Sequence, residues 1–162
     1  MSQTWPKNRV IKAPSREPFG NRPISVFLAG ITTRTEDGDL REALIECLAD
    51  CPLTFIDPYR PDWDSSWRED ITCAPFREQV EWELDMQEKA DVVVVYFHPA
   101  TDAPISLLEL GLCASTNKKT IVMCPEGYKK RGNVQIVCER HQIEIVEKGI
   151  IFGTWYGPFD WV

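Results

Sequence analysis

The stretch ADVVVVYFHPATDAPISLLELG, from Ala90 to Gly111, decides the fold and contains the most unusual polar residue of the chain. Residues 92–97 are apolar without alternation, which predicts a central parallel strand covered on both faces. Residues 105–115 predict a helix, in which Glu109 lies among leucines. A carboxylate in such apolar surroundings is costly to remove from water, so its position points to a function.

Strands and helices alternate on both sides of this stretch. Further strands are predicted at 24–29, 53–56, 120–124 and 143–146, and further helices at 39–50, 75–89 and 132–141. The alternation predicts an α/β fold with a doubly wound parallel sheet of five strands and helices on both faces. Ligands of such sheets bind beyond the carboxyl ends of the strands, so the loops after Ala29, Ile56 and Phe97 should surround one site.

The chain has 162 residues, of which 43% are hydrophobic, as expected for one domain with one core. We divide it into an extended, proline-containing arm at 1–22, an α/β domain at 23–150 and an aromatic tail at 151–162. The segment 58–74 is rich in Pro, Asp and Trp and is long for a loop, so it is expected to be functional or mobile.

Charge and composition exclude several classes of protein. The net charge is -7 and the basic residues are scattered, which argues against a nucleic-acid polymer as partner but leaves a small nucleotide open. We find no apolar run long enough for a membrane helix and no signal peptide, so we expect a cytoplasmic protein without a membrane partner. Six cysteines without a Cys-x-x-Cys pair, with two histidines, predict no metal site, and we expect no cofactor.

The loop after the first predicted strand, GITTRT from Gly30, is a candidate binding element. It matches neither the dinucleotide fingerprint nor the P-loop pattern. Gly30, Thr32 and Arg34 could hold a phosphate or a sugar hydroxyl, and the alternative is a solvated turn. Asp57, directly after the next strand, is a candidate substrate ligand at the same edge.

The acidic residues before Glu109 form a second candidate set: Glu81, Glu83, Asp85, Asp91 and Asp102. Taken singly, each is expected to be solvated, and Asp91 is expected to order the start of the strand. Two carboxyl groups in one site suit glycosyl chemistry, in which one attacks or stabilises the anomeric centre and the other protonates the leaving group. A buried acid with a raised pKa can donate that proton near neutral pH.

Aromatic residues form the third candidate set. Trp63 and Trp67 lie in the long loop, and Trp155, Tyr156, Phe159 and Trp161 lie in the tail. A flat heterocycle could stack on such rings. The alternative is that they pack on the core or on a partner subunit.

Three of these elements together resemble the nucleoside 2-deoxyribosyltransferases and the related deoxynucleoside 5'-monophosphate N-glycosidases. They are the strand VFLAGI, the helix acid before ADVVVV and the helix start SLLELG, and the likeness spans residues 24–146. The resemblance implies a flavodoxin-like domain that cleaves the N-glycosidic bond of a 2'-deoxynucleoside. It implies that Glu109 is the nucleophile of a covalent glycosyl-enzyme and that Glu83 protonates the departing base.

The resemblance also implies roles for residues outside the carboxyl pair. Asp102 would bind base or sugar, and one subunit would contribute Asn133 to the sugar site of its neighbour. The carboxylate of Val162 would also reach a neighbouring site. The expected assembly is therefore a homo-oligomer with shared active sites.

The sequence departs from the family pattern at four positions. Phe27 stands where the family offers a tyrosine hydroxyl, Glu83 replaces an aspartate, Pro104 replaces a small stretch, and the spacing from Asp102 to Glu109 is one residue longer. These changes are compatible with a hydrolase or with a non-catalytic nucleotide-binding or sensing module. The fold class alone is also compatible with a flavin-binding electron carrier. Arg34 would suit a monophosphate, whereas Asp102 would repel it, which favours a nucleoside.

Overall fold

The computed structural model describes residues 7–30, 32 and 34–146. All six strands of its single sheet are parallel, and their spatial order is β1-β3-β2-β4-β5-β6. The strands are β1 (Arg9–Lys12), β2 (Ile24–Gly30), β3 (Leu53–Asp57), β4 (Val92–Tyr96), β5 (Lys119–Met123) and β6 (Glu144–Val146). The tail 151–162, with its aromatic residues and Val162, lies outside the described residues.

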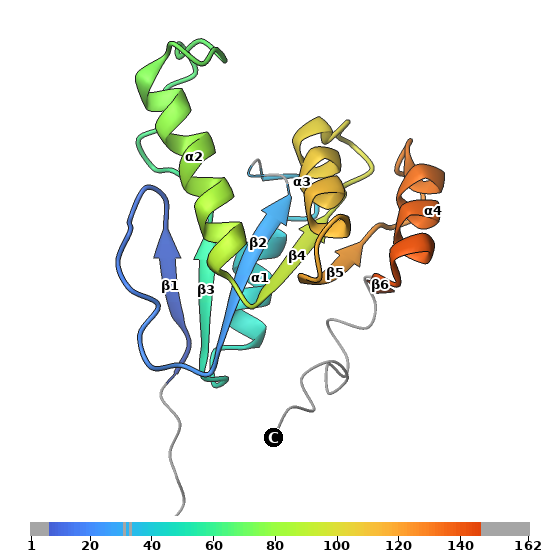
Figure 1. The fold of residues 1–162 in the computed structure, drawn as a ribbon, viewed down its shortest axis with the longest axis horizontal. Helices are drawn as coiled ribbons and strands as arrows, with labels where there is room; N and C mark the ends of the chain where they lie inside the picture. Colours follow the sequence, from blue (N-terminus) through green and yellow to red (C-terminus); the bar gives the residue numbers. More distant parts are fainter. Residues whose placement is uncertain (1–6, 31, 33, 147–162) are drawn as a thin grey trace, which may run out of the picture.

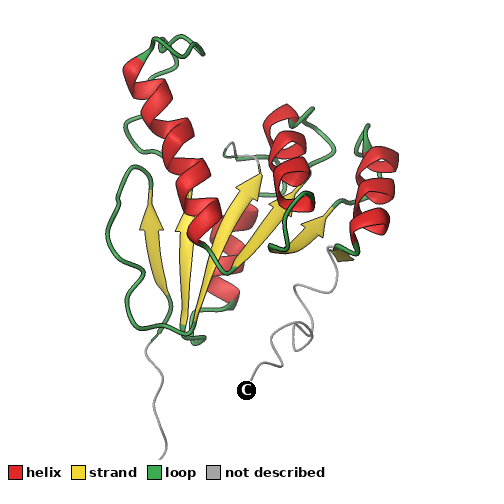
Figure 2. Cartoon of the chain, viewed as in Figure 1, coloured by secondary structure: helices red, strands yellow, loops and turns green. Residues whose placement is uncertain are grey.

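Four helices cover the two faces of the sheet (Figures 1 and 2). They are α1 (Leu40–Cys47), α2 (Ala74–Lys89), α3 (Pro104–Ala114) and α4 (Arg131–His141). Alternate residues of β2 and β4 point to opposite faces. Phe27 and Val93 pack with residues of α2, α3 and α4, whereas Leu28 and Val94 pack with residues of α1. Helices on both faces explain why β4 is apolar at every position.

The observed fold confirms the predicted α/β class and the order of its elements. Each predicted strand and helix is present, with small shifts at the ends. Without β1, the strand order is the 2-1-3-4-5 arrangement of flavodoxin-like proteins. The prediction of five strands is wrong by one, because residues 9–12 of the predicted arm form β1, which pairs with β3 at the sheet edge.

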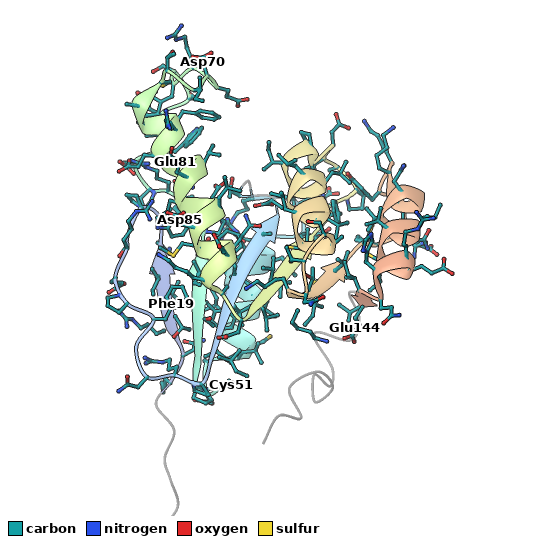
Figure 3. The ribbon with its side chains drawn as sticks, in the orientation of Figure 1. Phe19, Cys51, Asp70, Glu81, Asp85 and Glu144 are labelled. Carbon is teal, nitrogen blue, oxygen red and sulfur yellow. The ribbon has the colours of Figure 1, made fainter. Side chains whose placement is uncertain are left out.

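The rest of the arm packs against α2 and β3. The indole Nε1 of Trp82 donates to the carbonyl of Ser15 over 2.7 Å, and Trp82 is fully buried. Arg16 forms an ion pair with Asp85 of α2, and the carbonyl of Phe19 accepts a hydrogen bond from the hydroxyl of Thr54 on β3; Asp85 and Phe19 are labelled in Figure 3. The arm therefore fixes the helix that carries Glu83.

Candidate active site

Glu109 lies in the second turn of α3 with only 7% of its surface exposed. We expected the neighbouring leucines to bury it, but Leu108 is 61% exposed and Leu112 is 44% exposed. Successive residues of a helix point about 100° apart, so chain neighbours do not share a face. Glu109 is buried because it faces α2, where its Oε1 accepts a hydrogen bond from the side-chain amide of Gln87 over 2.8 Å.

A row of polar side chains along α2 forms the other half of the site. Gln79, Glu83 and Gln87 are four residues apart and therefore lie on one face of the helix. Gln79 Nε2 donates to Glu83 Oε1 over 2.8 Å and to the carbonyl of Pro58 over 2.9 Å. One glutamine thus orients each carboxyl group, Gln79 that of Glu83 and Gln87 that of Glu109.

Loss of hydration raises the cost of ionising both carboxyl groups. Burial, together with the charge of Glu83, raises the pKa of Glu109 to about 8, although the Gln87 hydrogen bond lowers it. Burial also raises the pKa of Glu83, against the hydrogen bond from Gln79. Both changes have the sign expected when an anion loses its hydration, and Glu109 also faces a like charge. The pair therefore retains a proton at neutral pH, as acid–base chemistry on a leaving group requires.

The other predicted acids have separate partners. Glu81 pairs with Arg77 over 2.6 Å, Asp85 pairs with Arg16 over 2.7 Å, and both pairs are exposed. Asp91 Oδ2 accepts hydrogen bonds from the backbone N–H and the hydroxyl of Ser25. These contacts connect the start of β4 to the start of β2, which is the ordering role predicted for Asp91.

Asp102 lies at the surface in the loop before α3. Its carboxylate pairs with Lys129, which lowers its pKa, and its carbonyl accepts the hydroxyl of Tyr128 over 2.8 Å. Among the described residues, we find no hydrogen bond or ion pair between Asp102 and the two glutamates. Ala103 follows in the left-handed conformation, with φ 44°, and Pro104 is the first residue of α3. The backbone is therefore strained where it enters the helix of Glu109.

The end of β2 requires a glycine. Gly30 has φ 135°, and a Cβ added there would lie 2.8 Å from the carbonyl oxygen of Tyr96 on β4. The following loop leaves Thr32 and Arg34 exposed, and Arg34 pairs with Glu42 of α1 over 2.6 Å.

Asp57, at the end of β3, belongs to a buried ion-pair network. Its Oδ1 accepts from Arg41 Nη1 over 2.8 Å and from the backbone N–H of Tyr59 over 2.9 Å. Arg41 also contacts Asp39 and donates to the carbonyl of Thr32 over 3.1 Å. The network connects the loops after β2 and β3, so Asp57 stabilises the arrangement of these two loops at the edge of the site.

A second connection joins the loops after β2 and β4. His98 Nδ1 accepts the backbone N–H of Ala100, which places the ring proton on Nε2, 3.1 Å from Asp37 Oδ2. His98 is 2% exposed. The sequence shows no signal of this contact, because His98 and Asp37 are 61 residues apart.

The long loop after β3 is organised around a buried arginine. Arg60 pairs with Asp62 over 3.0 Å and with Glu78 over 2.9 Å, and its guanidinium lies 5.0 Å from the ring centre of Trp67. The ring of Trp63 packs against the ring of Trp67 at 5.1 Å, and Trp63 is 43% exposed. These contacts place both tryptophans at the start of α2.

Three further features of the described residues bear on the predicted subunit contact, metal site and membrane helix. Asn133 is exposed on α4. In the described ranges, no group of three or more His, Cys, Asp or Glu side chains is arranged to hold a metal ion. No helix among the described residues is long and apolar enough to cross a membrane.

Neither glutamine of the α2 row is among the predicted site residues. The spacing of Gln79, Glu83 and Gln87 is a usable signal, because a polar row at four-residue intervals marks one helix face.

Fold and site together define a class of protein: a doubly wound α/β domain in which two helices carry a buried glutamate, Glu109, and a half-buried one, Glu83. The chain belongs to the family described as nucleoside 2-deoxyribosyltransferase like, whose sequence profile matches residues 23–128. The match includes Glu83, Glu109 and both glutamines of the α2 row. No curated protein matches the chain.

Among solved structures, the chain is similar to a conserved protein from Enterococcus faecalis V583. The two share 13% sequence identity, the alignment covers 80% of this chain and 84% of the other, and the TM-score is 0.44. A likeness of this size carries no argument about function.

Proposed function

We propose that the protein cleaves or transfers the N-glycosidic bond of a 2'-deoxynucleoside through a covalent intermediate on Glu109. The observation that carries this proposal is the pair of the buried Glu109 and the half-buried Glu83, each oriented by its own glutamine. Family membership supports a nucleoside as the substrate class, and burial of Glu109 with the raised pKa of both carboxyl groups supports the acid–base roles.

In the first step, a Glu109 oxygen attacks the anomeric carbon, and the bond from this carbon to the base nitrogen breaks. The electron pair of that bond leaves with the base, which takes a proton from Glu83. In the second step, water or another base attacks the anomeric carbon, the ester to Glu109 breaks, and Glu83 takes up the proton of the attacking group. Because each of the two displacements inverts the anomeric carbon, its configuration is retained overall.

The proton must be on Glu83 when the first step begins. In the free protein, burial favours protonation of Glu109, whose pKa is raised to about 8. The reactive form has the same total charge, with Glu109 ionised and Glu83 protonated. Gln87 supports this form, because its N–H stabilises the ionised carboxylate of Glu109.

A neutral nucleoside fits the described residues better than a 5'-monophosphate. Arg34, the predicted phosphate ligand, is paired with Glu42 at the surface, and Arg41 is held by Asp39 and Asp57. A phosphate would have to compete with these carboxylates.

The test is an assay with 2'-deoxynucleosides, with and without a free acceptor base, followed by separation of the products. We expect release of the base in water and exchange when the acceptor is present. Denaturation during turnover should trap one deoxyribosyl unit on Glu109, detectable by mass spectrometry of the peptide. Glu109→Gln should abolish base release and base exchange, whereas Glu88→Gln, an exposed control on α2, should not. Full activity of Glu109→Gln would exclude the proposed nucleophile.

A second candidate is a non-catalytic nucleoside-binding module. Phe27 favours it, because this fully buried ring packs 6.3 Å from Trp82 and offers no hydroxyl to the site. Calorimetry with product analysis separates the two functions. Tight binding of a nucleoside without any turnover supports the module, and release of the base supports the enzyme.

We also propose that the protein acts as a homo-oligomer with shared sites. Ile105, Leu108 and Leu112 are 58%, 61% and 44% exposed on α3. Their spacing puts them on one side of the helix, next to Glu109. Exposed apolar patches of this kind are typical of protein–protein contacts, and a second copy bound there would lie beside the active site.

A further inference from the structure

One buried polar atom beside the carboxyl pair has no partner in the described structure. Gln79 is 4% exposed, and its side-chain oxygen Oε1 accepts no hydrogen bond. A buried acceptor without a donor is unfavourable, and such atoms are rare in folded proteins.

The orientation of this amide follows from its other contacts. Both N–H groups of Gln79 are used, one by the carbonyl of Pro58 and one by Glu83 Oε1. A rotation that exchanged oxygen and nitrogen would bring the Gln79 oxygen against two other acceptors, which is repulsive. Gln79 therefore offers an acceptor, and only an acceptor, to a molecule bound at Glu83.

The same contacts determine which oxygen of Glu83 carries the proton in the reactive form. Oε1 of Glu83 accepts from Gln79, so Oε2 is the oxygen that carries the proton. Along α2, the order from the helix start is Gln79, Glu83 and then Gln87, which holds Glu109. A leaving base protonated by Glu83 thus lies between the nucleophile and the unpaired oxygen of Gln79.

We propose that Gln79 determines which base leaves, by accepting a hydrogen bond from an N–H group next to the base atom that Glu83 protonates. This inference rests on the proposed function. The preferred bases present an acceptor beside a donor. Adenine does so with N7 and its 6-amino group, and thymine with O2 and N3–H. Hypoxanthine and cytosine place a second acceptor there, which the Gln79 oxygen repels.

The unpaired oxygen is shielded from solvent in the free protein. A bound base must therefore displace the side chains that cover it. Site groups that hydrogen-bond a substrate reject analogues without the matching group far more strongly than apolar pockets reject small changes of size. The preference should accordingly be large for single-atom changes of the base.

The experiment compares two matched substrate pairs, deoxyadenosine with deoxyinosine and deoxyuridine with deoxycytidine. Uracil presents O2 and N3–H as thymine does and, like cytosine, has no 5-methyl group. We expect kcat/KM to favour the first member of each pair by roughly tenfold to a thousandfold. In Gln79→Met, which removes the acceptor at similar size, the preference should fall to within roughly threefold. Gln87→Met is the matched control on the same helix face and should lower activity on all four substrates while keeping their ratios.

A binding measurement makes the inference independent of turnover. Calorimetry of the Glu109→Gln protein with free adenine and free hypoxanthine should show the same preference, and Gln79→Met in that background should remove it. Circular dichroism verifies that each variant is folded. Equal kcat/KM within each pair overturns the role of Gln79 but leaves the proposed function intact. Absence of cleavage with all four substrates contradicts the proposed function, and the role of Gln79 is then judged by calorimetry, where equal or no binding of the two bases overturns it.

Discussion

Glu109, the proposed nucleophile, also lowers the stability of the fold at high pH. Its pKa is raised to about 8, so the folded state binds a proton more tightly than the unfolded chain. Protonation of buried Glu109 favours the folded state, so the free energy of unfolding is highest at low pH and falls as the pH rises toward 8. The site is thus maintained at the expense of the free energy of unfolding.

The first prediction concerns this pH dependence. Glu109→Gln keeps the shape and the acceptor for Gln87 but cannot ionise. Between pH 5 and pH 8.5, the wild type should lose roughly 3 to 5 kcal/mol relative to Glu109→Gln. Urea unfolding across this range measures the difference. Glu88→Gln, at the surface, should leave the wild-type slope unchanged, and parallel stability profiles for wild type and Glu109→Gln would refute the raised pKa.

The second prediction concerns Gln87. Its hydrogen bond favours the ionised form of Glu109, so Gln87→Met should raise the pKa of Glu109 further. The active form needs Glu109 ionised, and the acidic limb of the pH–rate profile should therefore move to higher pH by about one unit. Profiles of kcat/KM on one deoxynucleoside measure the change. A uniform loss of activity at every pH would instead indicate a purely structural role.

Sequence predicted the burial of Glu109 but not the residues around it. The apolar neighbours of Glu109 indicated burial correctly, although Leu108 and Leu112 turned out to be exposed. A local pattern reports how apolar a segment is, whereas the burying partner, α2, is distant in sequence. Gln79 and Gln87 were missed for the same reason, since their partners are set by tertiary packing.

At the scale of elements, the edge strand β1 and the glycine that ends β2 are the informative parts. Apolar strands such as β4 are predictable because burial on both faces leaves no polar position. The edge strand β1 is short, begins with Arg9 and ends with Lys12, so its composition resembles that of a loop. Its strand conformation depends on pairing with β3, which sequence periodicity cannot show.

The third prediction tests the end of β2. Gly30→Ala forces a Cβ to within 2.8 Å of the Tyr96 carbonyl at a φ of 135°. We expect a loss of about 2 to 4 kcal/mol in the free energy of unfolding, measured by urea denaturation. Gly111 in α3 is the control, because its Cβ would meet no atom within 4 Å. Gly111→Ala should stabilise the protein by about 1 kcal/mol through helix propensity, and equal effects of both changes would disprove the steric argument.

The fourth prediction tests the loop at 58–73. Arg60→Met keeps the buried stem but removes two ion pairs and the contact with Trp67. Amide hydrogen exchange within residues 61–73 should become faster, and the loss of stability should be about 1 kcal/mol. If Trp63 and Trp67 bind the base, KM should rise while kcat changes little. Arg68→Met, at an exposed position of the same loop, should have neither effect.

At the scale of the whole molecule, the alternation of strands and helices predicted the doubly wound class, and the family resemblance implied its flavodoxin-like type. The order β3-β2-β4-β5-β6 agrees with right-handed crossovers and a single reversal, which also allow other doubly wound orders. No comparable rule predicts from the sequence how subunits assemble. Asn133 is exposed, as the proposed donation to a neighbouring site requires, but exposure alone does not select a partner.

The fifth prediction tests the assembly. Leu108→Asp places a charge in the exposed apolar stripe of Ile105, Leu108 and Leu112, where it would lose its hydration on association. Light scattering should show an oligomer for the wild type and smaller particles for Leu108→Asp, with activity lost in parallel. Ile71→Asp, at a 71% exposed position in the loop before α2, should leave mass and activity unchanged.

Mixing two inactive variants distinguishes shared sites from a merely structural oligomer. Glu109→Gln lacks the nucleophile, and Asn133→Ala lacks the residue expected from the neighbouring copy. In a mixed oligomer, some sites combine a native Glu109 with a native Asn133 from the other copy, so activity should reappear after the two proteins exchange subunits. A mixture that stays inactive while mass measurements show exchange would place Asn133 in its own subunit's site or outside the site altogether.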